Sequence, residues 1–132
     1  MNVQWEEKHM NTRIELTEAT IENNRLILQP ASLSIEAGQL KAKGQMLVDS
    51  DQLTFIYILE SPDEFVYAGL PHTIWTKLKE AKEKDLPVIL QINENEIELT
   101  DIVPELNYLL ENIKGNANYG DEMENKVVEL FF

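Results

Sequence analysis

The sequence predicts a single α+β domain, in which an antiparallel sheet of about six or seven strands packs against about three helices. Short stretches of alternating or β-branched residues, separated by turn residues, fill most of the first 99 positions. Three segments instead space their apolar residues three and four apart, which is typical of amphipathic helices. The length of 132 residues suits one domain with one core.

We expect the domain to occupy residues 13–132 and residues 1–12 to form a flexible tail. The tail is polar and shows no periodicity, so it offers little apolar surface to hold it on a core. It has no apolar h-region, and the chain contains no apolar run of about 18 residues. These features predict a cytoplasmic protein that does not enter a membrane.

The predicted sheet begins with a hairpin. Apolar and polar residues alternate over 13–19, which predicts a half-buried strand, and residues 25–29 return as its partner. Residues 22–24, Glu-Asn-Asn, predict a tight turn between them, because asparagine tolerates a positive φ. Alternation over residues 33–36 predicts a further short strand.

A three-stranded antiparallel meander is expected next. Its strands are predicted at residues 45–48, 53–59 and 64–70, with turns at 49–52 and 61–63. The run LTFIYIL at 53–59 is apolar on both faces. We therefore expect this strand in the centre of the sheet, with something covering each of its faces.

Helical spacing first occurs over residues 71–85, where Ile74, Leu78 and Ala81 mark an apolar stripe. A proline at the start of this segment is compatible with the first turn of a helix. A second hairpin is expected after it, with strands at 88–92 and 96–99.

Two amphipathic helices joined by an elbow are expected to end the chain. Asp101 is the predicted N-cap of the first helix, and Gly115 is the predicted left-handed residue after it. Asp121 with Glu124 has the form of an acidic capping box, so the second helix is expected to start there. Because the chain finishes in Leu-Phe-Phe, its last turn should pack on the core or on a second subunit.

The charge balance narrows the classes of partner. The formal net charge is −13, and such an acidic chain is repelled by nucleic acid and by anionic membranes. The acids gather at the C-terminal end, where residues 94–132 hold ten of them against Lys114 and Lys126. This bias predicts a protein partner that meets an acidic face, although solubility alone also explains such a surface.

Catalytic signatures are missing from the sequence. There are no cysteines, which excludes disulfides and thiolate chemistry. The chain contains no P-loop, GxGxxG, HExxH or GxSxG motif. His9 and His72 stand alone, so we predict no catalytic residue and no cofactor, and we favour a non-enzymatic protein.

Two segments are candidate binding sites. The elbow contributes Asn116, Asn118, Tyr119 and Gly120, whose backbone N–H groups and tyrosine ring suit a partner or an anion. The other segment is the turn with Asp49 and Asp51, whose carboxylates are candidate ligands for a divalent cation. That turn lacks the third ligand of an EF-hand loop, because a leucine occupies position 53.

The strings GQMLVDSD at 44–51 and IELTDIVPELNYLLENIKGNANYG at 97–120 carry a resemblance to a known family. Over residues 13–132 the chain resembles the YjbL-like proteins, small uncharacterised proteins of low-GC Gram-positive bacteria. The resemblance implies a bacterial cytosolic protein. It implies no activity and transfers no catalytic residue.

These observations support three hypotheses about function. The first is a non-enzymatic protein-binding or regulatory module that acts through the acidic C-terminal helices and the elbow, and that also forms a homodimer. The second is a small-molecule- or metal-binding protein or enzyme that uses the Asp49–Asp51 turn and, as an anion cradle, the elbow. The third is a structural subunit whose apolar C-terminal end is its interface.

Overall fold

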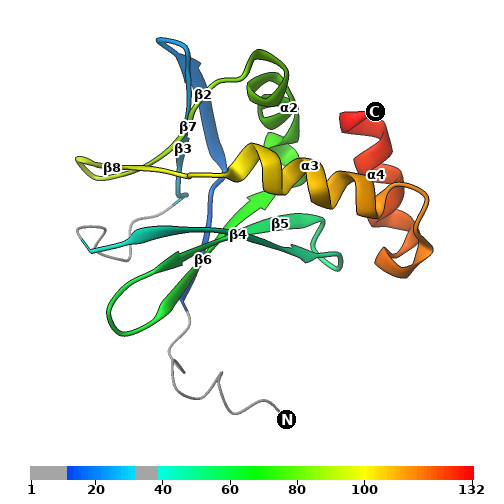
Figure 1. Ribbon diagram of the computed structural model, residues 1–132, viewed down its shortest axis with the longest axis horizontal. Coiled ribbons are helices and arrows are strands. Elements are labelled where there is room, and N and C mark those ends of the chain that lie inside the picture. The colour runs from blue at the N-terminus through cyan, green and yellow to red at the C-terminus, as the bar shows by residue number, and fades with distance from the viewer. Residues whose placement is uncertain (1–11, 32–38) are drawn as a thin grey trace.

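The computed structural model describes residues 12–31 and 39–132, and in these residues eight strands form two four-stranded sheets (Figure 1). The first sheet has the order β1-β6-β5-β4, with β1 (Thr12–Glu15), β4 (Lys41–Asp49), β5 (Thr54–Glu60) and β6 (Phe65–Pro71). The second has the order β2-β3-β7-β8, with β2 (Glu18–Glu22), β3 (Arg25–Gln29), β7 (Val88–Ile92) and β8 (Asn95–Glu98). The helices are η1 (His72–Ile74), α2 (Trp75–Lys84), α3 (Ile102–Ile113), η2 (Ala117–Tyr119) and α4 (Asp121–Phe131).

The α+β class and the single domain are confirmed, but the prediction of one antiparallel sheet of six or seven strands is wrong. There are two sheets, and each contains a parallel pair, β1 with β6 and β3 with β7. The stretch predicted as one strand over 13–19 divides into β1 and β2. Leu16 lies between them, fully buried, and its N–H donates to the Gly69 carbonyl at 2.8 Å. The chain passes from the first sheet to the second there. Apolar and polar residues alternate in the same way before and after this point, so the pattern does not reveal the change of sheet.

The meander and the second predicted hairpin are confirmed, and the first hairpin forms with β2, not with the whole predicted strand at 13–19, as the partner of β3. The turn between β2 and β3 places Asn23 at φ 53° and Asn24 at φ 61°, a left-handed pair that suits the twist of a two-residue hairpin. Asn93, at φ 55°, turns the chain between β7 and β8. Strands β4, β5 and β6 pair antiparallel in sequence order, so β5 lies inside its sheet as expected.

The core forms where the helices meet the inner face of the first sheet. Phe55 of β5 packs against Trp75 of α2 and Phe131 of α4, with ring centroids 4.8 and 6.3 Å away. The indole N–H of Trp75 donates to the Leu70 carbonyl at 2.8 Å, which satisfies its one polar atom. Phe131 is 6% exposed, so the predicted docking of the last helical turn on the core is confirmed.

The predicted helix over 71–85 is confirmed as η1 followed by α2, and Gly115 ends α3 at φ 73° as expected. The two side-chain caps are wrong. Asp101 adopts a left-handed conformation at φ 61° and its carboxylate caps nothing, because it lies against Gly44 of β4. The second helix, α4, starts at Asp121 as expected, but its N-cap is Gly120, whose carbonyl accepts the first helical hydrogen bond, from Glu124.

Two predictions fall on residues that the structure leaves undescribed. The flexible tail at 1–12 lies outside the described residues except for Thr12, with which β1 begins. The short strand over 33–36 lies outside them entirely.

Candidate functional site

The exposed side of α3, η2 and α4, which we call the C-terminal surface, carries large apolar side chains in contact with solvent. Tyr108 is 67% exposed, Phe132 49% and Val128 40%. Leu47 on β4, at 41%, is the other exposed large apolar side chain in the described part of the chain. Leu106, Leu109, Leu110 and Ile113 fill the core side of α3, which leaves Tyr108 on the solvent side.

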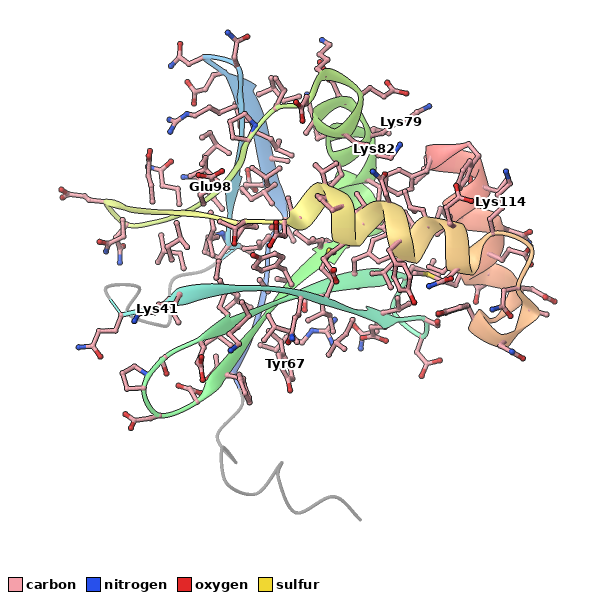
Figure 2. All side chains as sticks on the ribbon, viewed as in Figure 1. Lys41, Tyr67, Lys79, Lys82, Glu98 and Lys114 are labelled. Carbon is pink, nitrogen blue, oxygen red and sulfur yellow. The ribbon has the colours of Figure 1, made fainter. Side chains whose placement is uncertain are left out.

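Carboxylates of the C-terminal surface gather at the start of α4. Asp121, Glu122 and Glu124 form the first turn of α4, where the positive end of the helix dipole stabilises negative charge. The basic residues of the C-terminal surface already have contacts. Lys126 pairs with Glu129 at 3.2 Å, and the Lys114 ammonium lies 4.6 Å from the centroid of the Phe132 ring. The surface therefore presents exposed aromatic groups on helices that carry an excess of carboxylates, although Lys79 and Lys82 of α2 lie beside α4 (Figure 2).

A pocket of about 300 Å³ lies at the start of α3 and is also lined by acidic residues. It lies between the end of α2, β7, β8 and the first turn of α3, and Asp85, Glu98 and Asp101 are among its lining residues (Glu98 is labelled in Figure 2). Sequence reasoning missed this pocket, because its acids come from three separate elements. The sequence carried no signal for it, because the left-handed backbone at Asp85 and Asp101 appears only in the structure.

The elbow brings Asn116, Asn118, Tyr119 and Gly120 together in one tight turn. Their backbone N–H groups all donate hydrogen bonds inside the elbow. The N–H groups of Asn116, Tyr119 and Gly120 donate to the carbonyls of Ile113, Asn116 and Ala117, respectively, at 3.0 to 3.3 Å. The N–H group of Asn118 donates to the side-chain oxygen of Asn116 at 3.0 Å. Tyr119 is half-buried against the core, whereas the Asn118 side chain is exposed. The elbow is thus an internally bonded spacer between α3 and α4.

The other candidate, the turn after β4, is already occupied by protein groups. One carboxylate oxygen of Asp49 accepts from the Arg13 guanidinium at 2.8 Å, and the other accepts from the Gln52 N–H at 3.3 Å. Asp51 is exposed. Among the described residues, no cluster of three or more histidines and carboxylates is arranged to hold a metal ion.

Arg13 links the two edge strands of the first sheet, β1 and β4, and sequence reasoning missed this role. Its guanidinium contacts Glu15 on its own strand as well as Asp49 on β4. Partial burial lowers the pKa of Arg13, but the hydrogen bonds with Asp49 and Glu15 outweigh that effect and raise it overall. The spacing of Arg13 and Glu15, two residues apart on one strand face, was the signal in the sequence.

None of the helices in the described ranges is both long and apolar enough to cross a bilayer.

Comparison with known proteins decides the family. A family model described as a family of unknown function, UPF0738, matches residues 14–131. The chain belongs to the UPF0738 family. The resemblance that the sequence suggested is therefore confirmed. Every candidate residue of the elbow and of the Asp49–Asp51 turn lies inside the UPF0738 match.

Relatives in the UPF0738 family come from several Bacillus species. The chain is 48% identical to a UPF0738 protein of Bacillus licheniformis, 47% to YjbL of Bacillus subtilis and 41% to a UPF0738 protein of Bacillus mycoides. Each comparison covers 122 residues, which is 92% of this chain and 99% of the relative. No solved structure matches the chain. The likeness thus establishes an uncharacterised bacterial family and transfers no activity.

Proposed function

We propose that this protein is a non-enzymatic binding module of the bacterial cytoplasm, which captures a basic protein partner on its C-terminal surface. The observation that carries the proposal is the exposure of Tyr108, Val128 and Phe132 on α3 and α4, amid an excess of carboxylates. Aromatic side chains are enriched among the residues that dominate binding energy at protein interfaces, because they bury much area at little entropic cost.

The charge of the surface defines the chemistry of the partner. Residues 102–132, from the start of α3 to the last residue, carry six acids and two lysines, and both lysines have contacts within the protein. A partner that presents lysines or arginines beside apolar groups would complement this surface, and the opposite charges would speed association. Binding of this kind weakens as salt screens the charges.

The elbow adds geometry and one accessible polar group. Its internal hydrogen bonds fix the turn between α3 and α4, and thereby the relative placement of their exposed side chains. Asn118 is the elbow residue best suited to contact the partner, because its side chain is exposed while its backbone N–H is bonded within the turn.

The test is affinity capture from a Bacillus lysate, followed by calorimetry with the purified partner. The double variant Tyr108→Ala with Phe132→Ala removes both aromatic anchors without touching the core. If each anchor contributes about 2 kcal/mol, each truncation weakens binding roughly 30-fold. We expect a basic protein that the wild type retains, that salt elutes and that the double variant fails to retain.

Two matched variants sharpen this result. Leu47→Ala truncates an exposed apolar side chain on the first sheet, and we expect it to leave capture intact. Asn118→Ala keeps the backbone hydrogen bonds of the elbow, so weaker capture by this variant would assign the elbow a direct contact. Equal capture by the wild type and the double variant would refute the role of the C-terminal surface.

The alternative, a protein that binds metal or small molecules through the Asp49–Asp51 turn and the elbow, has less support. Both oxygens of Asp49 are engaged, and Arg13 already supplies the positive charge that a cation would bring. The N–H groups of the elbow that would face an anion are bonded internally. Titration calorimetry with magnesium, manganese and calcium tests this alternative, which requires a saturable heat that Asp49→Asn reduces.

A further inference from the structure

The side of the first sheet that faces away from the helices, which we call the outer face, has an apolar centre that is exposed only in part, because Ile56 is buried there while Leu47 is exposed. The strand register places Leu47 beside Ile56, and Ile58 beside Tyr67, on this side. Figure 2 shows Tyr67 below the sheet, on the side away from α3. Leu47 is 41% exposed, and Ile58 is half-buried.

All three described α-helices contact or overlie the opposite side of this sheet (Figure 1). Phe55 on that inner side contacts Trp75 and Phe131, and the Tyr57 hydroxyl donates to the carbonyl of Thr100, just before α3. The run of β5 is apolar on both faces, which predicts a cover on each. The described helices lie over only one of these faces, so Leu47 and part of Ile58 stay in contact with solvent on the outer face.

Charged side chains of both signs surround this apolar centre in equal number. Strand register and ion pairs place three basic and three acidic side chains on the outer face. They are Arg13, Lys41, Lys43, Glu15, Asp49 and Glu60. The balance contrasts with the C-terminal surface, since residues 102–131 of α3, η2 and α4 carry six acids and two lysines.

This balance indicates which occupant fits. A two-fold interface brings the same patch of two copies together, so the patch must complement itself. The C-terminal surface would repel its own copy, whereas the charges of the outer face balance and are mostly paired within each copy, so they do not repel a second copy. We infer that the outer face packs against the same face of a second copy of this chain, forming a homodimer of two stacked sheets. This inference is independent of the proposed partner on the C-terminal surface.

The size of the face sets the expected strength. Four strands about 4.8 Å apart, with roughly seven residues each at about 3.3 Å per residue, give a plane of about 440 Å² per copy. Two copies bury about 900 Å² before side-chain relief is counted, which is below the range of stable specific interfaces and typical of weak, transient ones. The dimer is therefore expected to dissociate in the micromolar range.

Sedimentation equilibrium of the full chain between about 1 and 200 µM tests the inference. The apparent mass should rise from 15.2 kDa toward about 30 kDa as concentration increases. Leu47→Lys should weaken dimerisation at least about tenfold, because it places a charge in the apolar centre. Since Leu47 is exposed in the single chain, this variant should melt close to the wild-type temperature.

The matched control is Val128→Lys, which makes the same change at a similarly exposed position of α4. It should dimerise like the wild type, and it separates the two proposals because it alters only the C-terminal surface. A wild-type chain that stays monomeric up to 200 µM would overturn the inference and leave the outer face to a different protein or to residues 1–11. Equal dimerisation by the wild type and Leu47→Lys would overturn it as well.

Discussion

The hydroxyl of Tyr57 links the two sheets, and its removal is the sharpest test of the fold. It donates to the Thr100 carbonyl at 2.6 Å and accepts from the Gly44 N–H at 3.1 Å. Tyr57 is fully buried in the first sheet, while Thr100 follows the last strand of the second and precedes α3. Tyr57→Phe keeps the ring and deletes both hydrogen bonds.

The structure sets the size of the effect. A neutral hydrogen bond contributes about 1 kcal/mol net, and a buried partner left unsatisfied costs more. Gly44 is half-buried and Thr100 is exposed, so water can partly replace the lost contacts. We therefore expect Tyr57→Phe to lower the free energy of unfolding by about 2 kcal/mol. For a domain of this length, that lowers the melting temperature by about 8 °C.

The same hydroxyl gives the effect a pH dependence. Burial raises the pKa of Tyr57 above 10, although the hydrogen bonds with Thr100 and Gly44 act in the opposite sense. The unfolded chain therefore ionises this tyrosine first as the pH rises. The stability that Tyr57 provides is fully present below about pH 10 and is lost as the pH rises through the folded pKa. The gap between wild type and Tyr57→Phe should narrow above pH 10.

Urea unfolding followed by circular dichroism at pH 7, 9 and 10.5 measures both effects. Tyr108→Phe is the matched control, because that side chain is 67% exposed, and its unfolding free energy should stay within about 0.5 kcal/mol of wild type. A Tyr57→Phe variant as stable as the wild type at pH 7 would show that the hydroxyl does not hold the sheets together.

Two further pairs of variants test the backbone and the core. Gly44→Ala should lower the free energy of unfolding by about 2 kcal/mol, because φ is 69° and the added methyl would lie 3.1 Å from the Asp101 carboxylate. Gly115→Ala should lower it by only about 1 kcal/mol, because φ is 73° but the space around the added methyl is open. Equal losses of melting temperature in the two variants would exclude the Asp101 contact. Phe131→Ala should cost about 3 kcal/mol, since it opens the aromatic core, while Phe132→Ala should cost under about 1 kcal/mol because that ring is 49% exposed. Similar thermal melting curves for these two variants would contradict the assigned docking of the last turn.

Local patterns in the sequence determined most of the elements. The hairpin at Asn23 and Asn24 followed from the tolerance of asparagine for positive φ, and the ends of α3 from its apolar stripe and Gly115. The burial of Phe131 followed from helical spacing that continues to the end of the chain. Such features depend on interactions between residues close together in the sequence, so the local residue pattern predicts them.

Candidate site residues were predictable only in part. The acidic bias of residues 94–132 and the tight elbow were readable, because composition and glycine placement are local properties. The engagement of Asp49 by Arg13 was not readable, since 36 positions separate the two residues. The exposure of Tyr108 at 67% also depended on how α3 packs, because an amphipathic helix can leave either flank of its stripe in solvent.

The sequence by itself thus determined the α+β class, the hairpins, the meander, the helices and the acidic C-terminal end. Only the tertiary structure decided that the strands divide into two sheets at Leu16, and that Asp101 lies against Gly44 instead of capping α3. Strand partners and the placement of a side chain between sheets depend on contacts between distant parts of the chain. Those contacts are stabilised by burial in a common core. The alternation of apolar and polar residues along one strand does not reveal which sheet the strand joins in that core.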